Sequence, residues 1–88
     1  MPFVYILRCG DGSLYTGIAK DLDRRLAQHQ AGCASRYTRS HQPVTLVWQR
    51  RIRTWGAALR EELRIKALTR PQKEELLSGR PPQVRRRA

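Results

Sequence analysis

Two apolar blocks near the N-terminus are separated by a cluster of turn-forming residues. Residues Phe3 to Leu7 are without exception apolar or aromatic, a pattern typical of a strand that is covered on both faces. The turn residues Gly10-Asp11-Gly12-Ser13 follow, and Leu14 to Ile18 then forms a second β-rich run. Two such runs joined by a turn rich in Gly and Asp predict a β-hairpin.

Two tyrosines of this hairpin share a parity and are therefore expected to point from the same face. They are Tyr5 in the first strand and Tyr15 in the second. If the turn centres near Asp11, Gly17 lies across from Tyr5. Because glycine has no side chain, we expect an open space beside the Tyr5 ring that can admit a substrate.

The rest of the chain shows three helical patterns and one further strand. Asp21 is an N-cap candidate for a helix that runs from Leu22 to about Gln30 and is ended by Gly32. The small, polar and basic residues 34–42 are predicted to form a loop. The other segments are a strand over Val44–Trp48 after Pro43, a helix from the cap Thr54 to about Leu68, and a short helix over Pro71–Leu77 ended by Gly79.

This order of elements, ββαβαα, predicts an α/β (α+β) fold with a small three-stranded, mostly antiparallel sheet flanked by helices. The 88 residues are enough for one domain with one modest core, which we place over residues 1–78. Residues 79–88 lack apolar periodicity and are predicted to be a disordered basic tail. Its Arg85, Arg86 and Arg87 are expected to add sequence-independent, salt-sensitive affinity for nucleic acid.

Charge and composition narrow the classes of partner. Lys plus Arg number 18 against seven Asp plus Glu, a formal charge of +11, which favours nucleic acid, with DNA first and RNA second. A membrane-surface helix explains the charge less well, because the arginines are spread along the whole chain. With neither a leader nor a membrane-spanning apolar run, a cytoplasmic location is expected. Cys9 and Cys33 lack zinc-site spacing and are expected to be reduced, packed thiols.

The second long helix places one carboxylate among apolar residues. On a helical wheel, Glu62 falls near the middle of a predicted buried arc, whereas Glu61 falls outside it. A buried carboxylate needs a cationic partner, so Glu62 is an ion-pair partner or a metal ligand, unless the wheel assigns the wrong stripe to the core. The arc consists of Trp55, Ala58, Leu59, Leu63 and Ile65.

The first helix carries two polar side chains beside its apolar stripe, which consists of Leu22 and Leu26. Arg25 and His29 are one helical turn apart and border this stripe. Both can simply extend along the rim of the sheet. Their predicted convergence with Tyr5, Tyr15 and Glu62 instead indicates a functional site.

This set of side chains suits phosphodiester hydrolysis, which needs a divalent cation, a donor for charge on the phosphate and a proton acceptor for water. Glu62 can hold a single Mg²⁺ or Mn²⁺, because Mg²⁺ often takes only one or two protein carboxylates. Arg25 can clamp the scissile phosphate. Tyr5 can act as general base if Arg25 and the metal lower its pKa, while Tyr15 and His29 orient water or phosphate. Ordinary sheet packing of the two tyrosines is the alternative.

The predicted loop Ser35–His41 interleaves aromatic, basic and hydroxyl residues. Such a composition suits phosphate contacts and stacking on an unpaired base, although a merely solvated loop can have the same composition. The residues expected to contact nucleic acid in or near the site are Gly17, Arg36, Tyr37, Arg39 and His41.

Two tyrosine triplets, Phe3-Val4-Tyr5 and Tyr15-Thr16-Gly17, are followed by an arginine-containing helix segment and then by a glutamate-containing one. These segments are Asp21–His29 and Ala58–Glu62. Over about Pro2 to Leu68 the chain therefore resembles the GIY-YIG nucleases. In size it is similar to the small stand-alone members of that family.

The resemblance implies a divalent-metal-dependent endonuclease that hydrolyses phosphodiester bonds in DNA, with structure selectivity or weak sequence selectivity and a role in DNA repair or processing. It implies that Tyr5 activates water, that Tyr15 and His29 are its partners, that Arg25 stabilises the phosphate and that Glu62 binds one metal ion. No small-molecule cofactor is expected. The alternatives are a nucleic-acid-binding module that cuts slowly or not at all, and an adaptor that docks an acidic protein.

Overall fold

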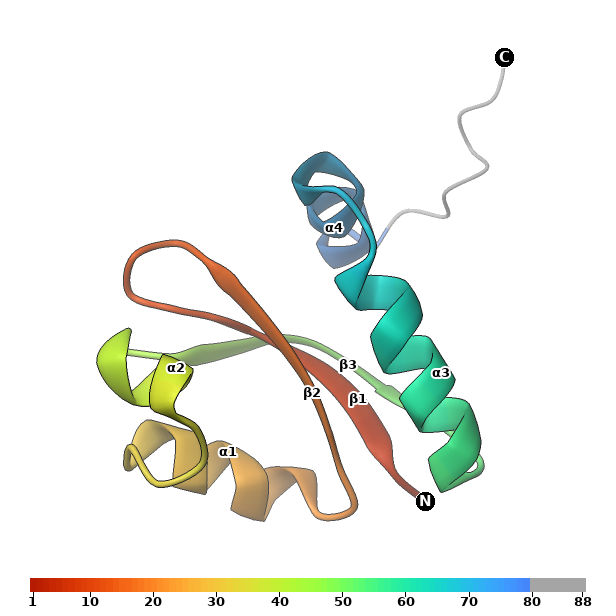
Figure 1. Ribbon diagram of the computed structural model, residues 1–88, viewed down its shortest axis with the longest axis horizontal. Helices are drawn as coiled ribbons and strands as arrows, with labels where there is room; N and C mark the ends of the chain where they lie inside the picture. The colour runs from red at the N-terminus through yellow and green to blue at the C-terminus, as the bar shows by residue number, and fades with distance from the viewer. Residues whose placement is uncertain (80–88) are drawn as a thin grey trace.

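The computed structural model describes residues 1–79 and shows a three-stranded antiparallel sheet with four helices in this part of the chain (Figure 1). The strand order is β2-β1-β3, so β1 is central and the other two strands are the edges. The predicted fold class is confirmed. The elements are β1 (Phe3–Arg8), β2 (Leu14–Ala19), α1 (Leu22–Gln30), α2 (Arg36–Ser40), β3 (Thr45–Arg51), α3 (Trp55–Lys66) and α4 (Arg70–Leu77).

The hairpin between β1 and β2 has the predicted register. Tyr5 pairs with Gly17 across the two antiparallel strands. In the turn, the Asp11 carboxylate accepts hydrogen bonds from the backbone N–H and the hydroxyl of Ser13, at 3.0 and 2.6 Å. Such short-range bonds stabilise turns in which Asp and Gly are frequent, and they fix the register of both strands.

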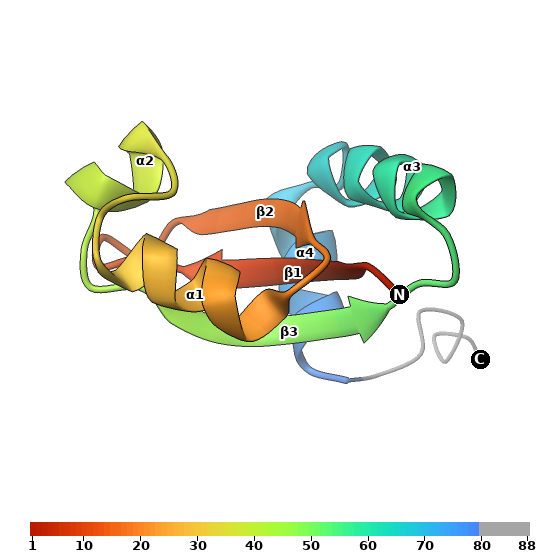
Figure 2. The same ribbon diagram turned by 90° about the horizontal axis from the view of Figure 1, so that it is seen from below.

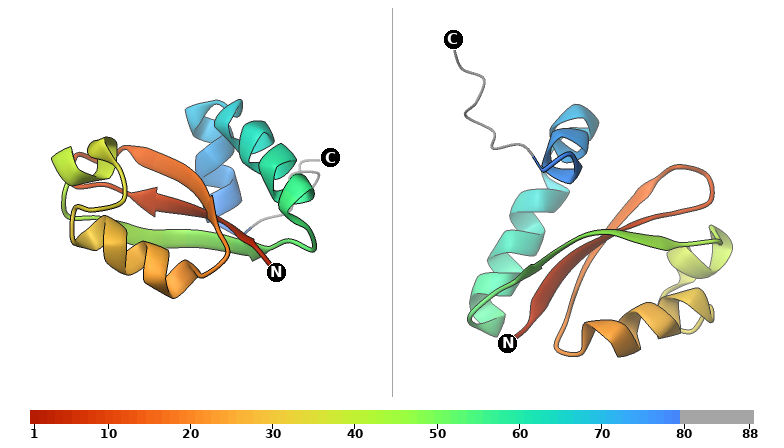
Figure 3. Two further views of the ribbon diagram at one scale, coloured as in Figure 1. Left: turned by 60° about the horizontal axis from the view of Figure 1, so that its bottom comes forward. Right: turned by 180° about the vertical axis from the view of Figure 1, so that it is seen from behind.

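The helices cover the sheet on both faces. Figures 1 and 2 show α1 and α2 on one side of the sheet and α3 on the other, and Figure 3 shows the same layers from two further directions. Burial on both faces explains the uninterrupted apolar sequence of β1. Its residues Tyr5 and Leu7 pack in the cluster on the α1 face, whereas Val4 and Ile6 pack with Ala58 on the α3 face.

One short helix was not expected. Residues 34–42 were predicted to be a loop, but α2 lies within them, so the element order in the described chain is ββααβαα. Ser35 caps this helix by accepting a hydrogen bond from the backbone N–H of Thr38 at 3.1 Å. A helix of five residues is too short to show an apolar period, which is why the pattern did not reveal it.

The buried face of α3 also differs from the wheel prediction. Ala58 and Ile65 are fully buried, whereas Trp55, Leu59 and Leu63 are exposed, so their assignment to the buried arc was wrong. The small Ala58 side chain lets the helix approach the sheet closely, and the larger residues lie on the adjacent stripe. Periodicity alone does not decide which of two neighbouring stripes packs on the sheet.

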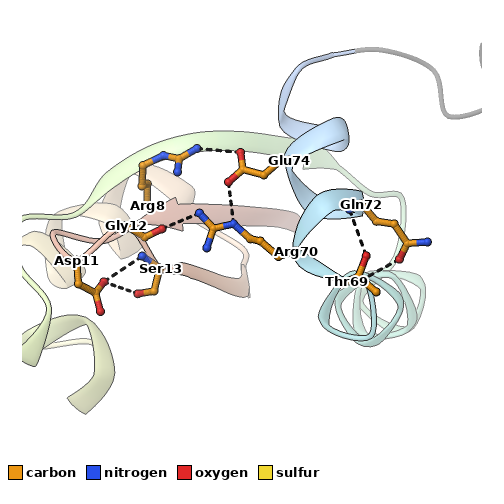
Figure 4. A network of polar contacts seen from close by, with 8 residues as sticks. All are labelled: Arg8, Asp11, Gly12, Ser13, Thr69, Arg70, Gln72 and Glu74. Carbon is orange, nitrogen blue, oxygen red and sulfur yellow. Dashed lines mark hydrogen bonds and ion pairs between the residues drawn. The ribbon is translucent and has the colours of Figure 1, made fainter.

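Polar contacts tie α4 to the hairpin (Figure 4). Arg70 donates to the backbone carbonyl of Gly12 at 2.9 Å and to the Glu74 carboxylate at 2.8 Å, and Arg8 donates to Glu74 at 3.4 Å. The helix begins with a capping box between Thr69 and Gln72. These contacts join α4 to the end of β1 and to the hairpin turn.

Several other predictions have a clear outcome. Cys9 is buried, but Cys33 is exposed, so the expectation of packed thiols was wrong for Cys33; both are free. Gly79 follows α4 in the left-handed conformation, as expected for a helix end.

No helix within residues 1–79 is long and apolar enough to cross a membrane. Residues 80–88, and with them Arg85, Arg86 and Arg87, lie outside the described residues.

Candidate active site

A buried hydrogen bond joins a tyrosine of the central strand to a histidine of α1. The Tyr5 hydroxyl oxygen lies 2.8 Å from Nε2 of His29, and only 1% of His29 is exposed. Their rings meet edge to face, with centroids 5.7 Å apart. Tyr15 contacts the same imidazole with a centroid separation of 5.2 Å. The expected convergence of the two tyrosines and His29 is therefore present.

Hydrogen bonds hold the His29 ring at both nitrogens. Its Nδ1 lies 2.8 Å from Oγ1 of Thr38, which in turn lies 2.9 Å from the Ser35 hydroxyl. The Gln42 side-chain amide donates to the backbone carbonyls of His29 and Thr38, both at 2.8 Å, and so joins the end of α1 to α2. We call Tyr5, His29, Thr38 and Ser35 the polar chain. It leaves His29 bound to Tyr5 and unable to reach solvent directly.

Gly17 makes room for Tyr5 and not for a substrate. A Cβ atom added at Gly17 would lie 2.5 Å from the Tyr5 hydroxyl oxygen and 2.7 Å from Cζ of its ring. The phenol of Tyr5 thus lies across the backbone of β2 and fills the space that we expected to be open. Any side chain at Gly17 would displace the hydroxyl.

Burial opposes charge on both members of the Tyr5–His29 pair. Burial first, and then Tyr15 and Glu62, raises the pKa of Tyr5 well above its usual value, and the Arg25 charge offsets this only in part. Arg25 by itself therefore does not bring the pKa of Tyr5 below its usual value, and the lowering by Arg25 together with a metal stays a prediction. Burial, followed by the Arg25 charge, lowers the pKa of His29. At about pH 7 its ring is then neutral, with one nitrogen that donates and one that accepts.

The two neighbouring glutamates of α3 have different partners. Glu61 binds Arg64 at 2.7 Å and Arg50 at 2.9 Å, and the hydrogen bond from Arg64 lowers its pKa most. Within residues 1–79, the one ion pair of Glu62 is with Lys66, at 3.2 Å. The side chains of Glu61 and Glu62 are 17% and 16% exposed, so Glu61 is covered as much as Glu62 although the wheel placed it outside the buried arc.

The acidic residues suit at most a metal ion with few protein ligands. Within residues 1–79 there is no group of three His, Cys, Asp or Glu residues that could hold a metal. Glu62 offers a partly accessible carboxylate whose charge acts on Tyr5. A single hard oxygen ligand fits a hydrated Mg²⁺ or Mn²⁺ that completes its shell with water and phosphate. It does not fit a structural metal centre.

Arg25 lies at the edge of β2, next to a small open pocket. Its side chain is half-buried and donates to the Gln28 side-chain oxygen at 3.4 Å. The pocket has a volume of about 190 Å³, and Lys20, Arg24 and Trp55 also line it. The Lys20 ammonium lies 5.8 Å from the Trp55 ring. Asp21 is the acidic residue of the lining, so the three cations give the pocket a net positive charge, and its volume leaves space for a phosphate group.

Of the predicted nucleic-acid contacts in and after α2, the two arginines lie apart from this centre, whereas Tyr37 adjoins it through Tyr15. Arg36 and Arg39 are exposed and line a separate pocket with Cys33. Tyr37 stacks on Tyr15, with ring centroids 6.0 Å apart. His41, the last of the predicted contacts in this segment, stacks on Tyr37, and its Nε2 lies 3.6 Å from the Asp11 carboxylate.

Sequence reasoning missed the residues that support His29. Thr38 and Ser35 contact it through the polar chain, and Gln42 holds its backbone. The one signal was Ser35, a good N-cap residue. Lys66, the partner of Glu62, was also missed, although a lysine four residues after a glutamate in a helix is a recognisable pair.

Comparison with known proteins identifies the family of the chain. The family model of the GIY-YIG catalytic domain matches residues 1–75. A UPF0213 protein of Staphylococcus aureus is 46% identical over 78 residues, which cover 89% of this chain and 95% of that protein. The solution NMR structure of a UPF0213 protein from Bacillus halodurans is 40% identical, with a TM-score of 0.60 and coverage of 96% of this chain and 90% of that chain. A solution NMR structure from E. faecalis is 37% identical, also with a TM-score of 0.60, and covers 88% and 82% of the two chains. The chain therefore belongs to the GIY-YIG family and is related to its UPF0213 proteins.

Proposed function

We propose that this protein is a divalent-metal-dependent endonuclease that hydrolyses phosphodiester bonds in DNA, with a role in DNA repair or processing. The observation that carries the proposal is the buried Tyr5–His29 hydrogen bond, on whose tyrosine the charges of Arg25 and Glu62 both act. A tyrosine, a proton acceptor, a cation and a carboxylate together supply each role that phosphodiester hydrolysis needs.

Tyr5 and His29 act together as the proton acceptor for the attacking water, which must gain access to a phenol that is only 2% exposed in the protein without substrate. The phenol donates its proton to Nε2 of the neutral His29 as its oxygen takes a proton from the water, whose oxygen forms the new bond to phosphorus. The raised pKa of Tyr5 disfavours a lasting phenolate. Passing the proton to His29 avoids one, and Thr38 holds the imidazole in place through Nδ1.

Arg25 and Glu62 serve the phosphate. The guanidinium of Arg25 donates to the phosphate oxygens, whose negative charge increases as water attacks. The carboxylate of Glu62 would hold the metal ion, which supplies further neutralisation of the phosphate charge and of the departing oxygen. For this, Glu62 must leave its ion pair with Lys66.

The charge of the chain supports nucleic acid as substrate. The formal charge of +11 favours polyanions without selecting a base sequence. The sequence contains no evident element for reading base edges in the major groove. We therefore propose structure selectivity or weak sequence selectivity.

A cleavage assay tests the proposal. The full chain is incubated with labelled single-stranded, duplex and branched DNA and with RNA, in Mg²⁺, Mn²⁺ or EDTA. We expect metal-dependent cleavage of at least one DNA, lost in EDTA and reduced on the order of 10²-fold or more in Arg25→Ala. Binding to every substrate without cleavage of any would instead favour a non-catalytic nucleic-acid-binding module.

A further inference from the structure

A second pocket lies along the open edge of the sheet, beside the first half of β2. Its volume is about 430 Å³. Strand β2 forms its floor, α2 one wall, and α3 and α4 the other, so residues from both helical layers meet across the sheet edge. It is lined by Leu14, Tyr15, Thr16, Tyr37, Lys66 and Lys73.

The wall formed by α2 is tied to the hairpin by several contacts of Tyr37. Tyr37 stacks on His41 with ring centroids 4.1 Å apart, and its hydroxyl donates to the side chain of Ser13 in the hairpin turn. It also stacks on Tyr15, at 6.0 Å. A fixed phenol at a pocket wall offers a preformed surface for a ligand at low entropic cost.

The opposite wall carries two positive charges. Lys66 comes from the last turn of α3 and pairs with Glu62 at 3.2 Å. Lys73 comes from α4, is half-buried, and has no ion pair among residues 1–79. None of the six residues that line the pocket is acidic. The pocket therefore attracts anions, and two ammonium groups suit phosphate oxygens.

The pocket adjoins the candidate active site. Tyr15 belongs to both, because its ring also contacts His29 at 5.2 Å. Lys66 links them again through its pair with Glu62. The other half of β2, with Ile18 and Ala19, lines the pocket that contains Arg25. A polymer that follows the edge of β2 therefore meets both pockets.

We propose that the pocket between α2 and α4 binds phosphate groups of the nucleic-acid strand on one side of the scissile bond, through Lys66 and Lys73. This inference rests on the proposed function, because the active site supplies the reference point for the strand. Lys73 reaches the strand from α4, an element that the hairpin contacts of Arg70 hold in place. The subsite is sequence-independent, since lysine contacts to phosphate do not read bases.

The test measures binding without cleavage. Anisotropy of a fluorescent DNA is titrated with the full chain in EDTA, at several salt concentrations between about 50 and about 200 mM. The slope of log K against log salt reports the number of phosphate contacts, at about 0.7 to 0.9 for each contact. Lys73→Ala should lower the magnitude of the slope by about one contact, and Lys66→Ala/Lys73→Ala by about two, while Lys73→Arg should retain it.

A matched control removes the same charge from the other edge of the sheet. Arg51 lies in β3 and is exposed, so Arg51→Ala should leave the slope unchanged. An unchanged slope in Lys73→Ala, or an equal loss in Arg51→Ala, overturns the subsite. Loss of binding to an oligoglutamate peptide but not to DNA in Lys73→Ala also overturns it, because the pocket would then serve an acidic protein.

The experiments can contradict the subsite proposal and the nuclease proposal independently. If the wild-type chain cuts DNA and Lys73→Ala does not alter the slope, the subsite is wrong and the nuclease proposal stands. If the chain cuts nothing but Lys73→Ala lowers the slope, the phosphate-binding surface stands and the nuclease proposal is wrong. Folding of each variant is checked by circular dichroism and thermal unfolding.

Discussion

The hydroxyl of Tyr5 lies 2.8 Å from Nε2 of His29, in a position closed to solvent by α1 and the sheet. Burial disfavours a charge on either group, so the pair is suited to passing a proton and not to storing one. This relationship makes Tyr5 and His29 one catalytic unit in our account, and it predicts that they respond together to mutation.

Tyr5→Phe should remove the hydroxyl and keep the ring. We expect cleavage to fall by about 10²-fold to about 10⁴-fold, the usual contribution of a general base, with DNA affinity close to wild type. His29 then loses a buried partner, which should cost about 1–3 kcal/mol of the free energy of unfolding. Cleavage kinetics, anisotropy and urea denaturation measure the three quantities. If Tyr5→Phe and His29→Gln reduce cleavage additively in the double variant, the two residues do not act as a unit.

Gly17→Ala should disturb Tyr5 from the neighbouring strand. The new Cβ would lie 2.5 Å from the Tyr5 hydroxyl oxygen, so we expect a loss of about 1–3 kcal/mol in unfolding free energy and a loss of activity. Gly56→Ala is the control, because its Cβ would meet nothing closer than 3.8 Å. As a helical substitution it should stabilise by up to about 1 kcal/mol. Full activity in Gly17→Ala at wild-type stability would contradict the placement of the phenol.

Thr38→Val should remove the support of His29 while keeping the shape of the side chain. Nδ1 of His29 loses the oxygen that lies 2.8 Å away, at a cost of about 1–3 kcal/mol of unfolding free energy. Thr38→Ser keeps the hydroxyl and should retain the His29 NMR chemical shifts, which report the tautomer, whereas Thr38→Val should change them. Identical imidazole shifts in Thr38→Val and wild type would show that Thr38 does not fix the ring.

The stability of the protein should fall in mild acid because of His29. Its pKa is lowered in the folded state from the usual 6.5. Just below about pH 6.5, His29 is therefore protonated in the unfolded chain but still neutral in the folded chain. The free energy of unfolding then decreases as the pH falls from about 6.5 toward the folded pKa of His29. Above about pH 6.5, the neutral His29 makes its full contribution to stability. Urea denaturation at several pH values checks this. His29→Gln should reduce the pH dependence there, and an unchanged dependence would contradict a neutral buried imidazole.

The features that the sequence predicted well depend on contacts between residues that are close together along the chain. The hairpin register followed from the turn around Asp11, and α1 begins at its cap Asp21, which accepts a hydrogen bond from the Arg24 N–H at 3.1 Å. Capping and turn bonds span only a few residues, so local sequence determines them. The same locality placed Arg25 and His29 on one side of α1.

The features that it missed depend on contacts between distant segments. Trp55 lies outside the core because the sheet packs on the stripe that contains Ala58, and no local rule selects that stripe. Thr38 supports His29 across two helices that Gln42 joins, and this arrangement links segments nine or more residues apart. The raised pKa of Tyr5 follows from burial, which a sequence pattern does not measure.

The most direct test of the site compares two neighbouring glutamates. Glu62→Gln and Glu61→Gln each remove one negative charge from α3, yet only Glu62 is placed to serve the phosphate in our account, whereas Glu61 is taken up by Arg50 and Arg64. The measurement is the initial rate of cleavage of one labelled DNA in Mg²⁺. We predict a rate lower on the order of 10²-fold or more for Glu62→Gln and close to wild type for Glu61→Gln. Equal rates in the two variants, or a Glu62→Gln protein that cuts like wild type, would contradict the central claim.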